Sequence, residues 1–570
     1  MVSVATALLI SILLPLVSAV IVLVIGSDQP QWVRRIALVS SLLTLLLVLR
    51  VVSGFDNAGD EYLKQYVVAS APGEDQPVAP FDAAKTAYAA SEFVWLPPST
   101  GFDIRFSTGL DGLSVWMYGL SAILMVSAVL VSWTAVTERV ALFYCMLLLL
   151  EAGCLGVFAA RDIIVFYVFF EFTLIPLFFL IGIWGSEQRR YAAIKFFLYT
   201  LFGSLFTFLG LLTLVLWHSD PSVHVISGSI PELLVRYAAN PLPTNVQFWV
   251  FLALFAGFAI KVPLFPLHTW LPLAHVQAPT AGSVFLAGIL LKIGTYGFLR
   301  FNMPLLPDAT VTFLPWIMWL SVVGIIYGAI VALVQSDMKR LIAYSSVSHL
   351  GFCMLGLFAL NPIGLQGGAL QMVNHGISTG ALFALIGMLY ERYHTREIAK
   401  FGGLTRRFPV MAFFMVLFTF SSIGLPGLNG FAGEIMILAG TFQRAWAEST
   451  GSLAWHLRWV SVLAVSGVVL GAWYMLSLVQ RVFFGPVLEP VTDHHHADDL
   501  STREVVALLP LAILVFWIGL FPQYFLEPMK TALQCSSHAA ATIVNAQSEA
   551  ETASAMAHRE LSQETLSRAY

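Results

Sequence analysis

The segment FWVFLALFAGFAIKVPLFPLHTWLPLAH (residues 248–275) decides the fold. It is an uncharged apolar run as far as Lys261, and Pro263 and Pro266 follow that lysine at once. A cation in hydrocarbon costs at least ~3 kcal/mol by insertion scales, and a proline inside a helix costs ~3 kcal/mol or more. Broken helices with an ionisable group near the bilayer midplane are typical of ion pathways in transporters. We therefore expect a broken membrane helix that lines such a pathway.

The composition is that of a polytopic membrane protein. Of the 570 residues, 58% are hydrophobic and 11% are charged, whereas soluble proteins carry about 25% charged residues. The mean hydropathy is +0.81. The net charge of −4 argues against a nucleic-acid partner. Four scattered cysteines without a CxxC pair, and the lack of phosphate-loop and dinucleotide patterns, predict no metal site and no cofactor in this chain.

About 14 apolar runs are long enough to span a bilayer, since a spanning helix needs ~20 residues. They lie near residues 3–25, 34–53, 111–133, 139–159, 162–184, 193–217, 246–270, 280–300, 311–334, 339–360, 367–390, 409–441, 459–484 and 504–526. The first run lacks a basic start and a cleavage site, so we expect it to be retained as a helix. The predicted fold is an all-α polytopic membrane bundle.

Basic residues in the short loops predict the orientation of this bundle, because such loops face the cytoplasm. They follow the odd-numbered spans, at Arg34 and Arg35, Arg189 and Arg190, Lys339 and Arg340, and between Arg392 and Arg407. The long segment 54–110 is acidic instead. Both chain ends are therefore expected on the non-cytoplasmic side.

The spans divide the chain into seven expected segments. These are helices 1–2 (1–53), a non-cytoplasmic loop insert (54–110), helix 3 (111–138), helices 4–8 (139–300), helices 9–13 (301–486), a cytoplasmic loop with the last helix (487–526) and a polar tail (527–570). We expect the insert to form a surface lid. The tail is equally compatible with an amphipathic helix on a neighbour and with a disordered terminus.

A second interrupted run, FTFSSIGLPGLNGFAGEIMILAG (418–440), resembles the first in its breaks. It breaks at Gly424, Pro426, Gly427 and Gly430, and it carries Glu434. Five predicted spans make up the distance between Lys261 and Glu434. An odd number of spans reverses a repeated unit, so we predict two inverted five-helix repeats, 139–300 and 301–486, each with a broken helix. Paired interrupted helices indicate a transport path.

Few ionisable residues lie inside the predicted spans, and proton transfer suits them. Burial favours the neutral form of lysines and carboxyl groups, whereas a neighbouring opposite charge restores the charged form. Separating Glu171 from Lys261 would then release a proton. The candidates for proton translocation are Glu171, Lys261, Lys292 and Glu434, and the candidate relays are His349, His375, His268 and Glu151.

Each candidate also has a structural interpretation. Glu171 and Lys261 can form a static buried ion pair, and Lys292 can be static as well. Glu151 can brace a helix contact, and His349 and His375 can be satisfied core histidines. The run His494–His496 could bind metal, but a solvated loop is the favoured interpretation.

Four motifs resemble the antiporter-like subunits of respiratory complex I. They are KVPLFPLHTWLPLAHVQAPTAGSVFLAGILLKIGTYGFLRF (261–301), FYVFFEFTLIP (166–176), ALVQSDMKRLIAYSSVSHLGF (332–352) and GLPGLNGFAGE (424–434). The resemblance covers residues 108–486 and is highly specific. Glu434 favours one of the three related subunits of that family, because close relatives often place Lys or Asp there.

The resemblance implies a proton-translocating subunit with 14 core helices in a bacterial inner membrane. In it, Glu171 matches the family's ion-pair glutamate, Lys261 the broken-helix lysine, Lys292 the connecting lysine and Glu434 the exit-side glutamate. Its partners would be other membrane-arm subunits, including homologous antiporter-like ones, and FMN, iron–sulfur clusters and quinone would be bound by partner subunits. Gln277 departs from the family, since many members carry Glu there.

Other functions fit the same residues. One is a subunit of a cation/proton antiporter complex, and another is a subunit of a ferredoxin- or hydrogen-linked membrane complex. A third is a structural spacer in a redox complex. The electron donor does not touch this chain, so co-purifying subunits would distinguish these functions.

Overall fold

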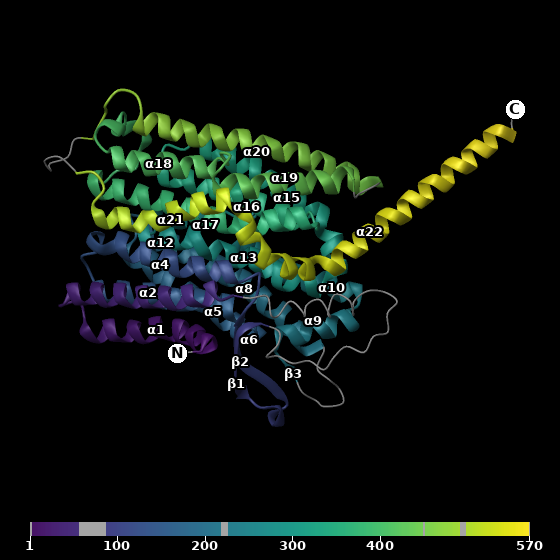
Figure 1. Cartoon of the computed structure of the whole chain (residues 1–570), viewed down its shortest axis with the longest axis horizontal. Helices are drawn as coiled ribbons and strands as arrows, with labels where there is room; N and C mark the ends of the chain where they lie inside the picture. The colour runs from purple at the N-terminus through teal and green to yellow at the C-terminus, as the bar shows by residue number, and fades with distance from the viewer. Residues whose placement is uncertain (1–2, 56–86, 218–225, 448–450, 491–497, 569–570) are drawn as a thin grey trace.

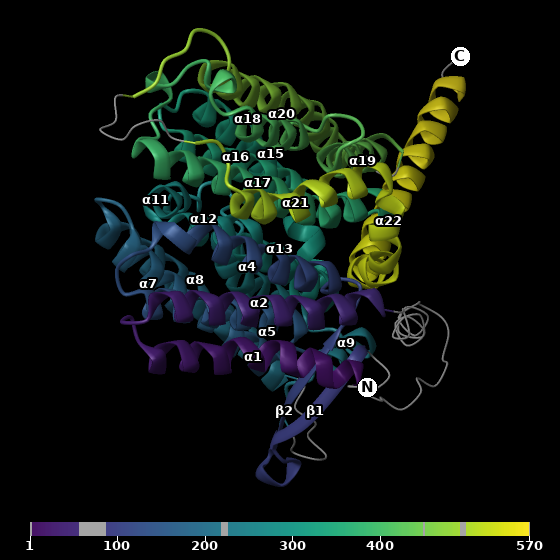
Figure 2. The same cartoon turned by 60° about the vertical axis from the view of Figure 1, so that its left-hand side comes forward.

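The computed structural model describes residues 3–55, 87–217, 226–447, 451–490 and 498–568. Long helices lie side by side in a single bundle (Figure 1). The N-terminal helices are α1 (Val4–Ile25), α2 (Pro30–Ser53), α4 (Val115–Ala135) and α5 (Val140–Ala159). Figure 2 shows α1 and α2 at one edge of the bundle. Their outer side chains are exposed and apolar, Val24 to 81%, as expected of residues that face lipid.

The next part of the chain holds the first broken helices. It comprises α6 (Ile163–Phe172), α7 (Leu174–Trp184), α8 (Arg189–Trp217), α9 (Ile230–Ala239), α10 (Thr244–Lys261), α11 (Trp270–Gln277), α12 (Thr280–Phe285), the π-helical turn η3 (Leu286–Leu290), α13 (Leu291–Gly297), the π-helical turn η4 (Phe298–Asn302) and α14 (Met303–Leu305). The break between α10 and α11 is where Lys261, Pro263 and Pro266 predicted it. The span predicted near 280–300 is one buried helix with two π-helical turns.

The rest of the chain contains the second broken helix. It comprises α15 (Pro307–Leu333), α16 (Met338–Leu357), α17 (Pro362–Tyr393), the short turns η5 (Ile398–Lys400) and η6 (Leu404–Arg406), α18 (Pro409–Ser422), α19 (Asn429–Trp446), α20 (Gly451–Phe483), α21 (Thr502–Leu520) and α22 (Pro522–Arg568). The interruption between α18 and α19 contains Pro426 and Gly427, as predicted. That the two halves are inverted repeats stays a prediction.

Twelve helices within the described residues are long and apolar enough to cross a membrane, against the expected number of about 14. The two other predicted spans, 339–360 and 409–441, are also helical. Buried polar residues lower the hydropathy of α16. The run 409–441 is divided into α18, of 14 residues, and the more polar α19. The difference therefore lies in the polar and broken helices that a hydropathy criterion excludes.

A β-hairpin is present where the sequence predicted only a loop insert in an all-α protein. The strands are β1 (Tyr88–Leu96) and β2 (Phe102–Leu110), with the short turn η2 (Pro98–Thr100) between them. They pair antiparallel, and β3 (Ile226–Ser227) pairs parallel with β2. Figure 2 shows the hairpin extending from the bundle. Residues 56–86 of the predicted lid lie outside the described residues, as does the histidine run 494–496.

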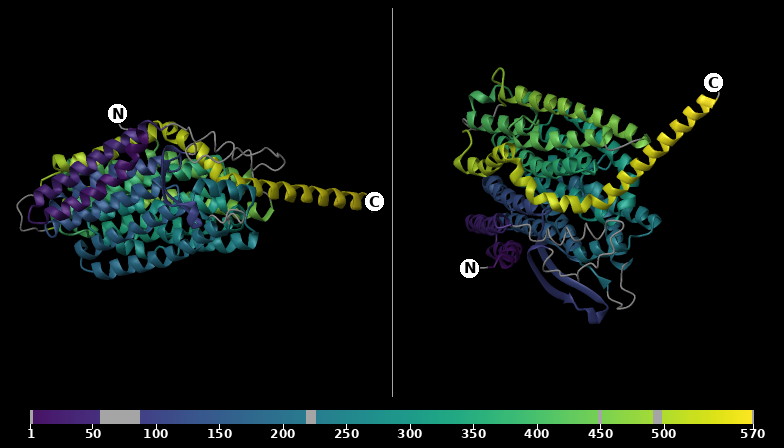
Figure 3. Two further views of the ribbon diagram at one scale, coloured as in Figure 1. Left: turned by 90° about the horizontal axis from the view of Figure 1, so that it is seen from below. Right: turned by 45° about the vertical axis from the view of Figure 1, so that its right-hand side comes forward.

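The polar tail forms most of a long helix, α22. This helix crosses the ends of the bundle helices, packs on α14, α15 and α17, and then projects beyond the bundle (Figures 1 and 3). Arg444 on α19 anchors it. The fully buried Arg444 guanidinium donates to the Ala359 carbonyl at 2.8 Å and to Asn545 Oδ1 on α22 at 2.9 Å. Of the two interpretations of the tail, the structure supports the helix.

Asp162 starts the helix that carries Glu171. Its Oδ1 accepts hydrogen bonds from the backbone N–H groups of Ile164 (2.8 Å) and Val165 (3.4 Å), which caps α6. Burial raises the pKa of Asp162 to about 6, although the backbone hydrogen bonds oppose this shift. Asp162 therefore caps α6, but burying its charged carboxylate costs free energy.

Replacing Asp162 by Asn should stabilise the protein above pH 6 by up to about 3 kcal/mol, since one pKa unit is worth ~1.4 kcal/mol and Asp normally titrates near ~3.9. The folded-state pKa is raised, so the wild-type contribution is favourable below pH ~4 and is lost as the pH rises to ~6. Asn keeps the capping oxygen without the charge. The measurement is the thermal unfolding midpoint in detergent from pH 4.5 to 7.5. Parallel pH curves for the two proteins would contradict the assignment.

Candidate functional site

The first break places a lysine in the interior of the bundle. Lys261 is the last residue of α10 and is only 3% exposed. Its Nζ lies 4.8 Å from the centre of the Phe170 ring on α6, a cation–π contact. Beyond the break, Trp270 Nε1 donates to the Ile260 carbonyl at 2.9 Å, which ties the start of α11 to the end of α10. The break is therefore a braced turn that holds a buried cation.

Glu171 and Lys261 are not in direct contact as an ion pair in this conformation, and their pairing stays a prediction. Within the described residues no ion pair joins them, and Glu171 Oε1 has no hydrogen-bond partner. The Phe170 ring, next to Glu171 in the chain, faces Lys261 instead. The two charges remain near enough to act on one another. Glu171 lies two residues before Thr173, where α6 ends and α7 begins.

Lys292 lies on the α13 helix between the π-helical turns η3 and η4, and it is fully buried. π-Helical turns leave backbone groups without their usual helical partners and are frequent at functional sites. The Lys292 ammonium donates to the Ala287 carbonyl in η3. It also lies 2.7 Å from His375 Nδ1 on α17. The turn therefore contributes a carbonyl to a buried cation.

A glycine allows the helices of the two lysines to touch. A Cβ at Gly294 on α13 would lie 2.7 Å from the Phe258 carbonyl oxygen and 2.8 Å from the Val262 nitrogen, both on or next to the end of α10. Real Cβ atoms essentially never approach so closely. Gly294 is two residues from Lys292, and Val262 adjoins Lys261. The backbone contact thus fixes the separation of the two lysine-bearing segments.

From Lys292 the polar groups continue to Glu434. The rings of His375 and His349 are 5.7 Å apart between centres. His349 Nδ1 lies 3.4 Å from Glu434 Oε1, and Gln371 Nε2 donates to the same oxygen at 3.2 Å. His349 Nε2 is 3.2 Å from Ser422 Oγ and 3.3 Å from Tyr474 Oη. Lys292, His375, His349 and Glu434 therefore form one continuous row, which we call the central row.

The second break is braced by amides and hydroxyls beside the central row. Asn374 Nδ2 donates to the Asn429 carbonyl at 2.7 Å, and Ser421 Oγ donates to Asn429 Oδ1 at 2.6 Å. Gly424 has a φ of +71°, and a Cβ there would lie 2.7 Å from Glu434 Oε2. Glycine is therefore required both for the turn and for the room of the carboxylate.

A small polar cavity adjoins the two histidines. It is lined by His349, Gln371, Asn374, His375, Ser378, Thr379, Ser421, Ser422 and Gly430, and it has room for about one water molecule. His375 Nε2 has no hydrogen-bond partner among the described residues. The cavity thus has room for a hydrogen-bonding molecule next to His375 and His349, whose ring nitrogens are only partly paired.

Glu151 and His268, both predicted relays, lie apart from this row. The fully buried Glu151 carboxyl on α5 accepts from Ser41 Oγ on α2 at 3.5 Å, so it faces the N-terminal helices. His268 lies in the first break, with its ring against Phe265 and Tyr327. No relay contact to Lys261 or Lys292 is made by either within the described residues. The sequence could not assign the side that each faces.

Further buried polar residues lie outside the set of predicted site residues. Lys339, predicted in a basic loop, is buried at the start of α16, and its Nζ donates to the Ala278 carbonyl at 2.6 Å. His275 is fully buried and stacked on Phe383 with ring centres 4.4 Å apart. Gln277 holds the α7–α8 turn, because its Oε1 accepts from the Gln188 N–H at 3.0 Å. The Gln277 amide therefore braces this turn.

The arrangement can move protons. The central row contains an ammonium, two imidazoles and a carboxylate, and a neutral imidazole has one ring nitrogen that accepts a hydrogen bond and another that donates one. Among the described residues no group of three or more His, Cys, Asp or Glu could hold a metal ion. The side chains of the row can exchange protons with their neighbours.

Comparisons with known proteins agree with this architecture. Residues 160–454 match the family model described as NADH:quinone oxidoreductase/Mrp antiporter, TM. The chain is 38% identical to NADH-quinone oxidoreductase subunit M of Rickettsia bellii over 91% of this chain and 96% of the relative. It is 39% identical to subunit M of Rhodobacter capsulatus, over 89% and 92%. A chain in the solved structure of respiratory complex I from Thermus thermophilus with bound NADH superposes with a TM-score of 0.75 at 30% identity, covering 94% of this chain and 99% of that one.

These relatives also agree with the branch that Glu434 predicted, chain M, the counterpart of mitochondrial subunit four. The matched region begins beside Asp162 and includes both broken helices and all four residues of the central row. The chain therefore belongs to the NADH:quinone oxidoreductase/Mrp antiporter transmembrane family and, within it, to the subunit M branch.

Proposed function

We propose that this chain translocates protons as a membrane-arm subunit of NADH:quinone oxidoreductase. Quinone reduction elsewhere in the complex supplies the energy, and FMN, iron–sulfur clusters and quinone are bound by partner subunits. This chain contributes no redox centre. In the orientation predicted from its basic loops, both chain ends lie outside the cytoplasm of a bacterial inner membrane.

The observation that carries the proposal is the central row. Its closest contact, 2.7 Å between Lys292 Nζ and His375 Nδ1, is a hydrogen bond along which a proton can pass. At the other end, His349 lies 3.4 Å from the Glu434 carboxylate. All four residues are at least 94% buried, which shields the row from bulk water. A static brace would not need two titratable imidazoles in succession.

The first break supplies the switch. In the observed conformation the Lys261 ammonium faces the Phe170 ring, and the adjacent Glu171 carboxylate is only partly paired. A small movement at the α6–α7 junction would replace the Phe170 ring by the Glu171 carboxylate as the neighbour of the Lys261 ammonium. We propose that this exchange holds the proton on Lys261 when Glu171 approaches and releases it toward Lys292 when Glu171 withdraws.

The alternative is a subunit of a cation/proton antiporter complex, which the family description itself includes. A ferredoxin- or hydrogen-linked membrane complex is a further alternative. All of them would use the same row. Purifying the chain with its partners and measuring FMN and NADH oxidation distinguishes them, because only the first proposal requires both.

Replacing Lys261 by Ala should abolish proton pumping by this subunit while leaving the complex assembled. The measurement is NADH-driven acidification of inverted membrane vesicles, with assembly checked by native electrophoresis. Lys400→Ala is the matched control. The Lys400 side chain is 54% exposed and forms an ion pair with Glu397 on the surface. Full pumping by the Lys261→Ala complex would overturn the proposal.

Replacing His375 by Phe should slow pumping by about tenfold or more, because positioned acid–base groups commonly contribute 10²–10⁴-fold. Phe keeps the volume of the imidazole but cannot carry a proton. His456→Phe, a histidine on α20 near Trp319 and outside the row, is the control. An unchanged pumping rate in His375→Phe would show that the proton bypasses this residue.

Replacing Gly294 by Ala should impair pumping without removing any titratable group. The added Cβ must displace α13 from the end of α10, and overpacking of this kind costs ~1–3 kcal/mol. Gly471→Ala on α20 is the control, because a Cβ there meets only Tyr474 Oη at 3.9 Å. Pumping and thermal stability are measured together. Equal behaviour of the two variants would rule out a functional role for this contact.

A further inference from the structure

Two buried titratable side chains outside the central row lie between that row and the end of the bundle that carries the basic loops. They are Lys339 at the start of α16 and His275 on α11, and we call them the side branch. Lys339 is 4% exposed, and His275 is fully buried. The loop before α16 is one of the basic loops that are predicted to face the cytoplasm. The mechanism proposed above uses neither residue.

His275 is a buried imidazole whose ring makes no hydrogen bond to the protein. The ring stacks on Phe383 of α17, with the ring centres 4.4 Å apart. Within the described residues, neither Nδ1 nor Nε2 has a hydrogen-bond partner. The backbone is held separately, because the His275 carbonyl accepts from Ser283 Oγ at 3.1 Å. Buried polar side chains are almost always paired, so an imidazole with two free nitrogens indicates a role beyond packing.

The charges that act on His275 are those of two lysines. One is Lys339 of the side branch, and the other is Lys292 of the central row. His275 in turn acts on His375, whose Nδ1 lies 2.7 Å from Lys292 Nζ. His275 is therefore within electrostatic range of both Lys339 and the central row. Because like charges repel strongly in a buried site, a proton on His275 is disfavoured while both lysines are charged.

Lys339 is held by a carbonyl, without a carboxylate at ion-pair distance within the described residues. Its Nζ donates to the Ala278 carbonyl at the end of α11 at 2.6 Å. Asp337 attracts the Lys339 charge from farther away, but Asp337 pairs with Arg396 at 3.4 Å, and Arg396 repels Lys339. The nearest partner of the Lys339 ammonium is thus a neutral oxygen.

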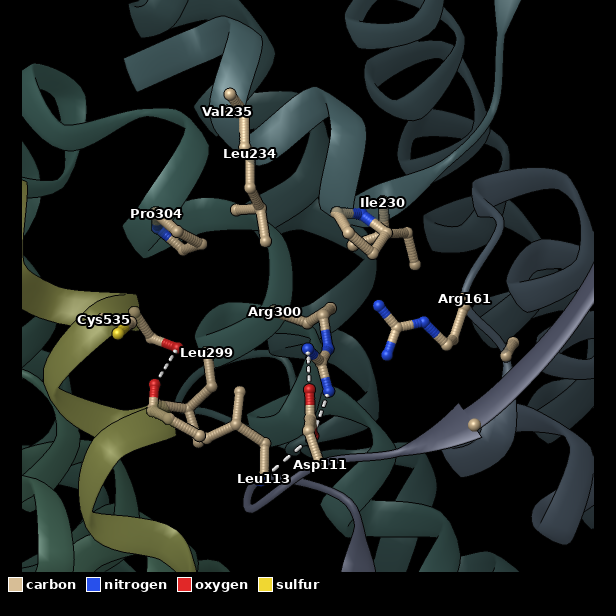
Figure 4. Close-up of a pocket in the computed structure, with 15 residues that line it drawn as sticks. Asp111, Leu113, Arg161, Ile230, Leu234, Val235, Leu299, Arg300, Pro304 and Cys535 are labelled. Carbon is tan, nitrogen blue, oxygen red and sulfur yellow. Dashed lines mark hydrogen bonds and ion pairs between the residues drawn. The ribbon is translucent and has the colours of Figure 1, made fainter. Parts of the chain in front are cut away.

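Arg300 shows the contrasting case. It lies in η4, beyond the α13 helix that carries Lys292, and it donates two hydrogen bonds to the Asp111 carboxylate, at 2.5 Å and 2.7 Å (Figure 4). A guanidinium in a bidentate pair of this kind keeps its charge. A buried lysine ammonium that is bound by a carbonyl can instead give its proton to a nearby base. The side branch supplies such an acid in Lys339 and such a base in His275.

We propose that the side branch carries protons from the cytoplasm to the central row, with His275 as a gate that opens when Lys292 is neutral. This inference rests on the proposed function. Once Lys292 has passed its proton to His375, one of the two positive charges that act on His275 is gone. Lys339 then gives a proton to His275, and His275 passes it to Lys292. Lys339 recovers a proton from the cytoplasm, and water molecules carry the proton between side chains that are not directly hydrogen-bonded.

The charge of Lys292 thus decides when the side branch delivers a proton. While Lys292 is charged, including by a proton received from Lys261, it repels a proton on His275. The central row is therefore loaded with one proton at a time, whichever side that proton comes from.

Replacing His275 by Phe in the assembled complex tests the side branch. Phe retains the stack on Phe383, and the ring loses no hydrogen bond, so a purely structural role predicts unchanged pumping. We expect NADH-driven acidification of inverted vesicles to slow about tenfold, because positioned acid–base groups commonly contribute 10²–10⁴-fold and the route from Lys261 remains open. The thermal unfolding midpoint should be unchanged or higher, since an unpaired buried polar group is removed. His456→Phe is the control.

The outcomes separate the side branch from the central row. If Lys261→Ala and His375→Phe stop pumping while His275→Phe pumps at the wild-type rate, the central row stands and the side branch is overturned. If none of the three variants changes pumping, the proposed function is overturned, and the side branch with it.

A second variant covers failure of His275→Phe to assemble. Lys339→Arg keeps a cation for the Ala278 carbonyl, but a guanidinium does not release its proton in proteins. We therefore expect slower pumping by an assembled complex. A lysine that only caps α11 would be replaced by arginine without loss, so wild-type pumping by Lys339→Arg overturns the proposal. Lys400→Arg, at an exposed lysine, is the control.

Discussion

A charge inside the bilayer core must be neutralised, hydrogen-bonded or enclosed by protein, and this constraint governs the whole structure. Lys261, Lys292 and Glu434 are each at least 95% buried. Lys292 is satisfied by the Ala287 carbonyl of a π-helical turn and by His375. An unbroken α-helix would use that carbonyl itself. The irregular backbone and the buried charges therefore depend on each other. The irregular backbone frees a carbonyl, and the buried ammonium donates a hydrogen bond to it.

The two breaks are stabilised in different ways, which matches their proposed roles. At the first, an indole N–H from Trp270 bridges the helices, and the lysine faces a ring. A ring holds a cation less tightly than a carboxylate does, which suits a position where a charge must be released. At the second, Asn374, Asn429 and Ser421 are linked by hydrogen bonds. That network fixes Glu434 next to His349, which suits an end point.

The partners of the buried charges separate the charges that we propose to carry protons from those that join helices. Arg444 donates to the Ala359 and Leu360 carbonyls and to α22. Arg392 forms a bidentate pair with Glu504, so both arginines join helices. Each group of the central row lies next to another titratable side chain. The type of neighbouring group, more than the extent of burial, distinguishes the charges that join helices from those of the central row.

The sequence by itself determined the membrane architecture, both helix breaks, the family and the four charged positions, because a cation or a proline in an apolar run is expensive wherever the chain folds. Only the tertiary structure decided which side chains meet. It placed Phe170 and not Glu171 against Lys261, brought His375 to Lys292 and His349 to Glu434, and turned Glu151 toward α2. It also revealed the β-hairpin and brought His275 within range of Lys339 and Lys292. Such contacts depend on helix rotation and on close approaches at glycines such as Gly294, and hydropathy along the chain contains neither.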